Sequence, residues 1–240
     1  MKPEFASSFL NRDELIYARS TAWRDRRLHS IAHRDIQFAL IEGPCLVFHI
    51  VPALAVTSTL VLDAEEISGK AIGFQSFGHG GGSPCFNADG YAVATSHEKT
   101  KAYSQMFRTG VFEGVDADVT YASDGQQVLR LALSEKAILA AANAYLQFGP
   151  ELGLAPPHWC HTTVIGAKGV RAIHNHDYSD YSIDRNVLHL PDVRIENPAL
   201  GIAAQLRPTC NALWNALGYQ RSWTFEESCK DIGLECDKQS

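Results

Sequence analysis

A short turn at Thr109-Gly110 constrains the fold of this chain more than any other feature of its sequence. The turn separates residues 102–108 from residues 111–115, two runs in which apolar side chains recur at alternating positions. A two-residue linker that ends in glycine is typical of a β-hairpin. We therefore expect two antiparallel strands here, joined by this turn.

Other turn signals divide the rest of the chain into further strands. Residues 45–51 follow a Gly-Pro breaker, end before Pro52 and are rich in β-branched and aromatic side chains, which predicts a buried strand. A second hairpin is expected between residues 160–165 and 170–173, because two glycines lie between these runs. More strands are expected at residues 91–95, 187–190 and 193–195.

Three helices are expected from apolar side chains at helical spacing. The first covers residues 11–34, and the second runs from about Ser134 to a Gly-Pro breaker. The third begins with Asn197 as its N-cap and Pro198 in its first position, and Gly218 follows its end.

Strands that follow one another through tight turns, with helices before, between and after them, favour an α+β fold. We expect a largely antiparallel sheet built from hairpins, on which an N-terminal, a central and a C-terminal helix pack. A chain of 240 residues can bury one sizeable core. We expect a single domain over residues 1–222 and a polar, loosely held tail at residues 223–240.

The composition is that of a globular protein, with 45% hydrophobic and 20% charged residues. No run approaches the ~18 consecutive apolar residues of a membrane-spanning helix, and the N-terminus lacks an apolar signal segment. We therefore expect a cytoplasmic protein, away from membranes, with reduced cysteines. The cysteines expected to be reduced are Cys45, Cys85, Cys160, Cys210, Cys229 and Cys236. The net charge of −6 argues against a dedicated duplex-binding module.

A colinear set of short blocks resembles one bacterial family. The blocks are residues 45–52 (CLVFHIVP), 86–90 (FNADG), 103–115 (YSQMFRTGVFEGV), 145–157, 164–171 (VIGAKGVR), 183–191 (IDRNVLHLP) and 206–222 (LRPTCNALWNALGYQRS). They resemble the C-terminal region of bacterial ATP-binding proteins whose N-terminal part is a Schlafen-like AlbA_2 (divergent AAA-4) domain. The resemblance implies a freestanding copy of that region, without the AlbA_2 domain to which ATP binding belongs. It supports the expected fold and supplies no catalytic residue.

The densest group of potential metal ligands flanks the second expected hairpin. His158 and His161 precede it, and His174 and His176 follow it, so both ends could meet at the open end of the hairpin. Imidazoles suit zinc or another divalent metal. The spacing fits no standard zinc framework, so partly exposed loop histidines are the simpler interpretation. No cofactor is then expected, and a metal site remains the alternative.

Two charged groups could also bind ligands. Arg24, Arg26 and Arg27 could contact phosphates of a nucleic acid or nucleotide, although nearby acids favour an ordinary solvated helix face. The acidic loop that contains Asp177, Asp180 and Asp184 could hold Mg²⁺, although loops are usually polar because they face water.

A glycine-rich loop and one cysteine complete the candidates. Residues 77–84 (FGHGGGSP) match no established phosphate-binding spacing, so a flexible surface loop is the simpler expectation. Cys160 has histidine neighbours, but no nucleophile signature surrounds it, and no G-x-S-x-G motif occurs in the chain.

The sequence thus favours a binding domain without catalysis of its own. We expect an accessory module of a nucleic-acid-linked or stress/defence system, which binds a small ligand or a partner protein encoded nearby. One alternative is a metal-dependent hydrolase or nuclease built on residues 158–184. A second alternative is a nucleic-acid binder that uses the N-terminal arginines.

Overall fold

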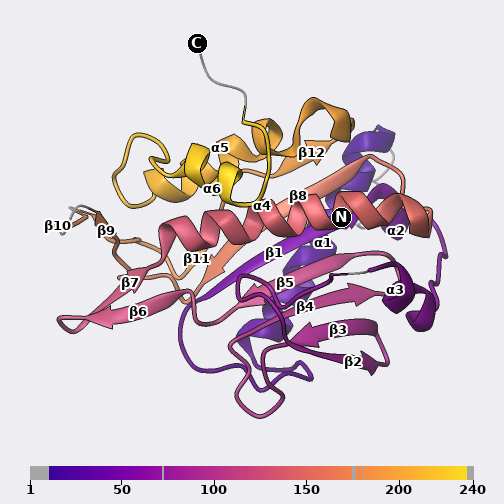
Figure 1. Cartoon of the computed structure of the whole chain (residues 1–240), viewed down its shortest axis with the longest axis horizontal. Coiled ribbons are helices and arrows are strands. Elements are labelled where there is room, and N and C mark those ends of the chain that lie inside the picture. Colours follow the sequence, from indigo (N-terminus) through magenta and orange to yellow (C-terminus); the bar gives the residue numbers. More distant parts are fainter. Residues whose placement is uncertain (1–10, 72, 175–176, 180, 237–240) are drawn as a thin grey trace, which may run out of the picture.

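One antiparallel sheet organises the chain, as the computed structural model of residues 11–71, 73–174, 177–179 and 181–236 shows (Figure 1). The strands follow the order β11-β8-β1-β5-β4-β3-β2, and β12 also pairs with β8. Two short ribbons, β6 with β7 and β9 with β10, lie outside this sheet. The strands are β1 (Cys45–Pro52), β2 (Ser83–Asn87), β3 (Gly90–Ala94), β4 (Ala102–Phe107), β5 (Phe112–Asp116), β6 (Thr120–Ser123), β7 (Gln126–Leu129), β8 (His158–Ile165), β9 (Ile173–His174), β10 (Asp177–Tyr178), β11 (Val187–His189) and β12 (Val193–Ile195).

Helices cover both faces of the sheet, which confirms the expected α+β fold. In Figure 1, α1 lies behind the sheet, whereas α4 crosses in front of it with α5 and α6 beside it. The helices are α1 (Arg12–Ala32), α2 (Ala53–Thr57), α3 (Ala64–Lys70), α4 (Leu131–Phe148), α5 (Ile202–Asn215) and α6 (Phe225–Asp231), with 3₁₀ turns at Gly149–Leu152 and Pro198–Leu200.

Strand β1 shows how the sheet divides the core. Successive side chains of a strand point to opposite faces. Val47 therefore packs in one cluster with Leu28 and Ile31 of α1, while Phe48 packs in the other with Ile138 of α4. Every residue of β1 is buried, so the centre of the sheet is covered on both sides.

The hairpin expected at Thr109-Gly110 is present, with β4 and β5 paired in antiparallel register. Gly110 has a φ of +86° and lies against Leu154, so a side chain at this position would meet both strain and a clash. The first expected helix is also present as α1. Its N-cap is Asn11, which exchanges hydrogen bonds with Glu14 in a capping box.

Two local expectations are wrong. Residues 160–165 belong to β8, which pairs with β1, β11 and β12 instead of with residues 170–173. The glycines after β8 do turn the chain, but the sheet position beside β8 is filled by later strands. The last helix begins at Ile202 after Gly201, because the Asn197-Pro198 start signal opens only a 3₁₀ turn.

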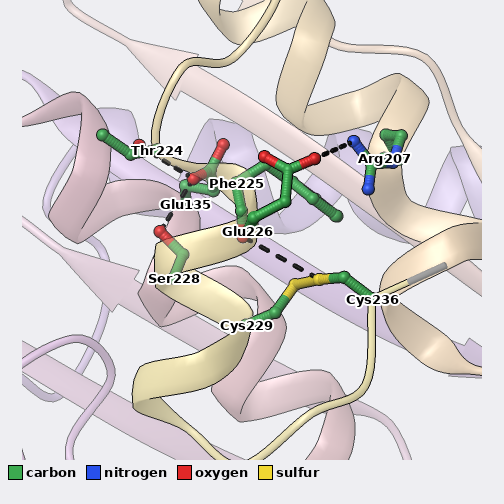
Figure 2. The surroundings of a disulfide bond; sticks show 8 residues. All are labelled: Glu135, Arg207, Thr224, Phe225, Glu226, Ser228, Cys229 and Cys236. Atoms are coloured by element: carbon green, nitrogen blue, oxygen red, sulfur yellow. Dashed lines mark hydrogen bonds and ion pairs between the residues drawn. A yellow bond between two sulfur atoms is a disulfide. The ribbon is translucent and has the colours of Figure 1, made fainter. Parts of the chain in front are cut away.

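The C-terminal segment is also better ordered than expected. In place of a loosely held tail, residues 225–231 form α6, with Phe225 and Cys229 buried in the main core. Cys229 forms a disulfide with Cys236, so these two thiols are not free, contrary to the sequence expectation. Figure 2 shows this region around the disulfide.

Glu135 of α4 anchors the start of α6. Its Oε1 accepts hydrogen bonds from Thr224 Oγ1 at 3.0 Å and Ser228 Oγ at 2.8 Å (Figure 2). Burial raises the pKa of this carboxyl, although the hydroxyl donors oppose the shift. Arg207 holds the outer side of α6 through an ion pair with Glu226 at 3.0 Å and a position over the Phe225 ring.

None of the helices in the described part of the chain has both the length and the apolar character needed to cross a membrane.

Candidate functional site

A buried carboxylate from the sheet meets an arginine from α1 at the centre of the α1-facing side. Glu113 lies on β5 and is fully buried. Arg27 of α1 grips it with two hydrogen bonds, from Nε to Oε2 and from Nη2 to Oε1, each 2.9 Å long. This is the bidentate geometry for which a guanidinium is best suited. The pairing fixes the position and the plane of the Arg27 side chain.

Two neighbouring strands complete the shell around Glu113. Tyr103 of β4 donates its hydroxyl to Oε1 at 2.7 Å, and His49 Nε2 of β1 lies 3.0 Å from Oε2. Burial alone would raise the pKa of Glu113, but the bonds from His49 and Arg27 outweigh it and hold the pKa at about 2. Glu113 is therefore an ionised acceptor with four donors around it.

A second unit of the same composition lies beside the first. His161 of β8 is paired in register with His49, and its Nδ1 lies 2.8 Å from Asp192 Oδ1. Asp192 also accepts a hydrogen bond from Tyr17 at 2.8 Å and forms an ion pair with Arg24 at 3.4 Å. Each histidine thus faces one carboxylate, and each carboxylate is held by one arginine and one tyrosine.

Ser20 extends the second unit into an order of contacts found in serine hydrolases. Its Oγ lies 3.2 Å from His161 Nε2, on the far side of the ring from Asp192. However, Ser20 is fully buried under α1, and its hydroxyl donates to the Tyr17 carbonyl at 2.9 Å. Because a substrate has no route to this hydroxyl, we interpret the chain of contacts as structural.

A cavity of about 290 Å³ opens beside the first unit, between the segment that follows α1 and strands β4 and β5. We call it the Arg27 pocket. Its walls come from residues 34–38 after α1, from the turn between β2 and β3, and from β4 and β5. The side chains that matter most for its chemistry are Arg27, Phe38, Asp89, Tyr103, Gln105, Phe107 and Glu113.

The Arg27 pocket has rigid polar groups on its floor. The Gln105 side chain is almost fully buried and donates to the Met106 carbonyl at 3.0 Å, and its oxygen accepts from Asn87 at 2.6 Å. Asn87 also accepts the Gly90 amide at 2.8 Å, which shapes the turn that carries Asp89. The pocket therefore presents amide, carboxylate and guanidinium groups whose positions are set by the sheet.

Aromatic rings form the other walls of the pocket. Phe38 stacks on Tyr103 with ring centroids 4.2 Å apart, and the Arg27 guanidinium lies 5.0 Å from the centre of the Phe107 ring. A ring face attracts a flat cation such as this guanidinium. The aromatic rings of the pocket wall are thus buried and packed against Tyr103 and Arg27.

The arginines proposed from the sequence as phosphate contacts divide into two groups. Arg24 and Arg27 point inward and hold Asp192 and Glu113, while Arg26 is exposed. Two of the three side chains are therefore engaged by carboxylates instead of forming an open basic face.

The histidines proposed as metal ligands are separated by the sheet. His161 lies on the α1 side, whereas His158 packs against Tyr145 of α4 on the other side. The two imidazoles cannot bind one ion, because they project from opposite faces of β8. The side chain of His174 and all of His176 lie outside the described residues. Among the residues that the structure does describe, no group of three metal-binding side chains converges.

The remaining candidates from the sequence are also accounted for. The Asp177 side chain and all of Asp180 lie outside the described residues, and Asp184 is exposed and paired with Arg185 at 2.7 Å. Cys160 is buried on the α4 side of β8, and burial raises the pKa of its thiol well above the ordinary range. It therefore lacks the thiolate character of a nucleophile.

The sequence reasoning missed Glu113, His49 and Tyr103 as site residues. A weak signal was present, because Glu113 and His49 are titratable residues inside otherwise apolar strand runs. All three lie in strand runs that the sequence predicted, within residues 45–52 and 102–115.

Comparisons with protein-family models, with curated proteins and with solved structures gave no match to this chain.

Proposed function

We propose that this chain is a binding domain without catalysis of its own, and that the Arg27 pocket holds a small, uncharged polar molecule. One observation carries the proposal. Glu113 fixes Nε and Nη2 of Arg27 on the wall of the pocket, and the Arg27 side chain still keeps 22% of its surface exposed. A donor that is already fixed in place loses little freedom when a ligand binds to it.

The charges around the pocket favour an uncharged ligand. Arg27 and Arg34 contribute two positive charges, and Asp35, Asp89 and Glu113 contribute three negative ones. An anionic ligand would gain from Arg27 but would face three carboxylates, so its net attraction is small. A neutral molecule with an acceptor toward Arg27 and a donor toward Asp89 uses both groups without this repulsion.

The electrostatics of the pocket support binding over catalysis. A general acid or base works best when its pKa lies near the working pH. Glu113 has a pKa of about 2 and four donors around it, and burial raises the pKa of Tyr103 well above its ordinary value. Neither group is suited to exchange protons with a ligand near neutral pH.

Nucleosides meet these requirements as a class. A nucleobase has acceptors and donors on one edge, which match the guanidinium of Arg27 and the carboxylate of Asp89 on the pocket wall. This ligand class also agrees with the accessory role in a nucleic-acid-linked or stress/defence system that the family resemblance implies. A partner protein encoded nearby belongs to the same proposal.

The test uses adenosine, guanosine, cytidine and uridine as separate probes, with binding measured by isothermal titration calorimetry. We expect at least one nucleoside to bind. Asp89→Asn removes an exposed carboxylate, and Arg27→Lys replaces the planar guanidinium with a single ammonium group. Each variant should weaken that binding by about tenfold or more. Arg26→Lys is the matched control, because Arg26 is exposed on the same helix, and it should bind as the unmodified protein does.

Binding of none of the four nucleosides, or equal loss in the Arg26→Lys control, would contradict the proposal. Melting temperatures of all variants separate a lost contact from a lost fold. Asp89→Asn is the decisive variant, since it changes the pocket without touching the buried Glu113 shell.

A further inference from the structure

The glycine-rich loop that the sequence singled out is fixed to the sheet at two points and is closed on itself by a third contact. Phe77 packs directly over Gly114 of β5, where an added Cβ would lie only 2.6 Å from the ring. His79 Nε2 lies 3.0 Å from Asp116 Oδ1, and Ser76 binds the Gly81 carbonyl through its amide and its hydroxyl. These contacts hold the loop in a defined position on the α4 side of the sheet.

A cavity of about 400 Å³ lies between this loop and α4. We call it the loop cavity. Phenylalanine rings and the alanines of α4 line most of it, including Phe74, Phe112, Phe148 and Ala140. Among the described residues that line it, the only charged side chain is Lys136, which is paired with Asp231 at 3.0 Å. The lining therefore favours an uncharged, largely apolar occupant.

Two buried serines line the loop cavity, Ser76 and Ser104, and the Ser76 hydroxyl already donates to the Gly81 carbonyl. Ser104 of β4 is only 2% exposed and lines the cavity, and its hydroxyl makes no hydrogen bond to any described residue. A ligand oxygen that bonds to this hydroxyl gains a hydrogen bond inside a largely apolar cavity. Ser104 lies between Tyr103 and Gln105 in sequence, but its side chain points to the opposite face of the sheet. The loop cavity is thus separate from the Arg27 pocket.

We propose that the loop cavity is a second ligand site, which takes a small apolar molecule carrying one hydroxyl or carbonyl oxygen. The apolar part lies between the phenylalanine rings and α4, and the oxygen meets the Ser104 hydroxyl. This site is independent of the proposed nucleoside site, because no side chain used in the argument is shared between them.

A matched pair of probes tests the role of Ser104. 4-Propylphenol and propylbenzene differ by one hydroxyl group, and their binding is measured by ligand-observed NMR titration. We expect 4-propylphenol to bind more tightly than propylbenzene. Ser104→Ala should weaken the binding of 4-propylphenol by about 3- to 10-fold and leave the binding of propylbenzene unchanged. An unchanged ratio between the two probes in Ser104→Ala would overturn the assigned role.

A pair of variants on α4 tests the location. Ala140→Leu fills the loop cavity, whereas Ala132→Leu makes the same change at an exposed position of the same helix. We expect Ala140→Leu to weaken the binding of both probes by more than about tenfold, and Ala132→Leu to leave the binding of both unchanged. Equal binding by these two variants, or no binding of either probe to the unmodified protein, would overturn the proposal. Nucleoside binding should be unchanged in both variants, so failure of one site is distinguishable from failure of the other.

Discussion

His49 and His161 lie directly opposite one another on β1 and β8, and each contacts a different carboxylate. The His49 ring is 3.0 Å from Glu113, and the His161 ring is 2.8 Å from Asp192. Both carboxylates are in turn held by arginines of α1. The contact between α1 and the sheet is therefore a layer of paired polar groups as well as apolar packing. Loss of one partner of a buried ion pair in this layer should therefore destabilise the folded protein.

Removal of the charge of Glu113 should destabilise the protein strongly. Glu113→Gln leaves the Arg27 guanidinium without its anion, and breaking a buried pair in this way typically costs about 3–5 kcal/mol. The free energy of unfolding from urea titrations measures the loss. Glu98→Gln is the control, because Glu98 is exposed, and it should change stability by less than about 0.5 kcal/mol. Similar values for the two variants would show that the Glu113 shell contributes little.

Stability should fall on acidification in two separate steps. Burial lowers the pKa of His158 from 6.5 to about 4, so the unfolded chain binds a proton there first. The resulting stability is fully present above pH 6.5 and is lost as the pH falls toward 4. Glu113 has its pKa lowered from 4.5 to about 2, so its contribution is lost only between these values.

A substitution of His158 separates the two steps. His158→Phe keeps a ring against Tyr145 and cannot be protonated. Between about pH 7 and about pH 5, the free energy of unfolding should fall less steeply in this variant than in the unmodified protein. Because burial also lowers the pKa of His49, part of the slope should remain. Equal slopes for the two proteins would contradict a neutral, buried His158.

The sequence predicted those features of the fold that depend on neighbouring residues. The hairpin at Thr109-Gly110 follows from the turn itself, and α1 follows from its spacing and its cap. The hairpin proposed after β8 failed because the pairing of β8 is decided by strands distant in sequence. The segment at residues 225–231 looked like a tail because most of its residues are polar, yet Phe225 and Cys229, one helical turn apart, are buried.

The candidate site was harder to predict because its parts are distant in sequence. Arg27 and Glu113 are separated by 86 positions, and His49 and Glu113 by 64. A single sequence gives no distance between such residues. It does show titratable residues inside apolar runs, and two of them, His49 and Glu113, are brought together by the fold.

The close contact between Phe77 and Gly114 should be intolerant of a methyl group. Gly114→Ala places a Cβ 2.6 Å from the Phe77 ring, so the ring and the glycine-rich loop must move. Overpacking of this kind typically costs about 1–3 kcal/mol. Gly69→Ala in α3 is the control, since nothing lies within 4 Å of the added atom, and it should be neutral or stabilising by up to about 1 kcal/mol. Thermal unfolding of both variants measures the difference, and a melting temperature of Gly114→Ala at or above that of Gly69→Ala would contradict the contact.

Two tryptophans near the end of the chain should differ sharply in their contribution to stability. Trp214 of α5 is 2% exposed and packs edge-on against Tyr219, whereas Trp223 is 53% exposed. Trp214→Ala removes a large core side chain and should cost about 3–5 kcal/mol. Trp223→Ala makes the same chemical change near the surface and should cost less than about 1 kcal/mol. Urea titrations followed by circular dichroism measure both values without relying on tryptophan fluorescence. If Trp214→Ala is as stable as Trp223→Ala, α5 is not packed on α4 through this side chain, and the described core at the C-terminal end is wrong.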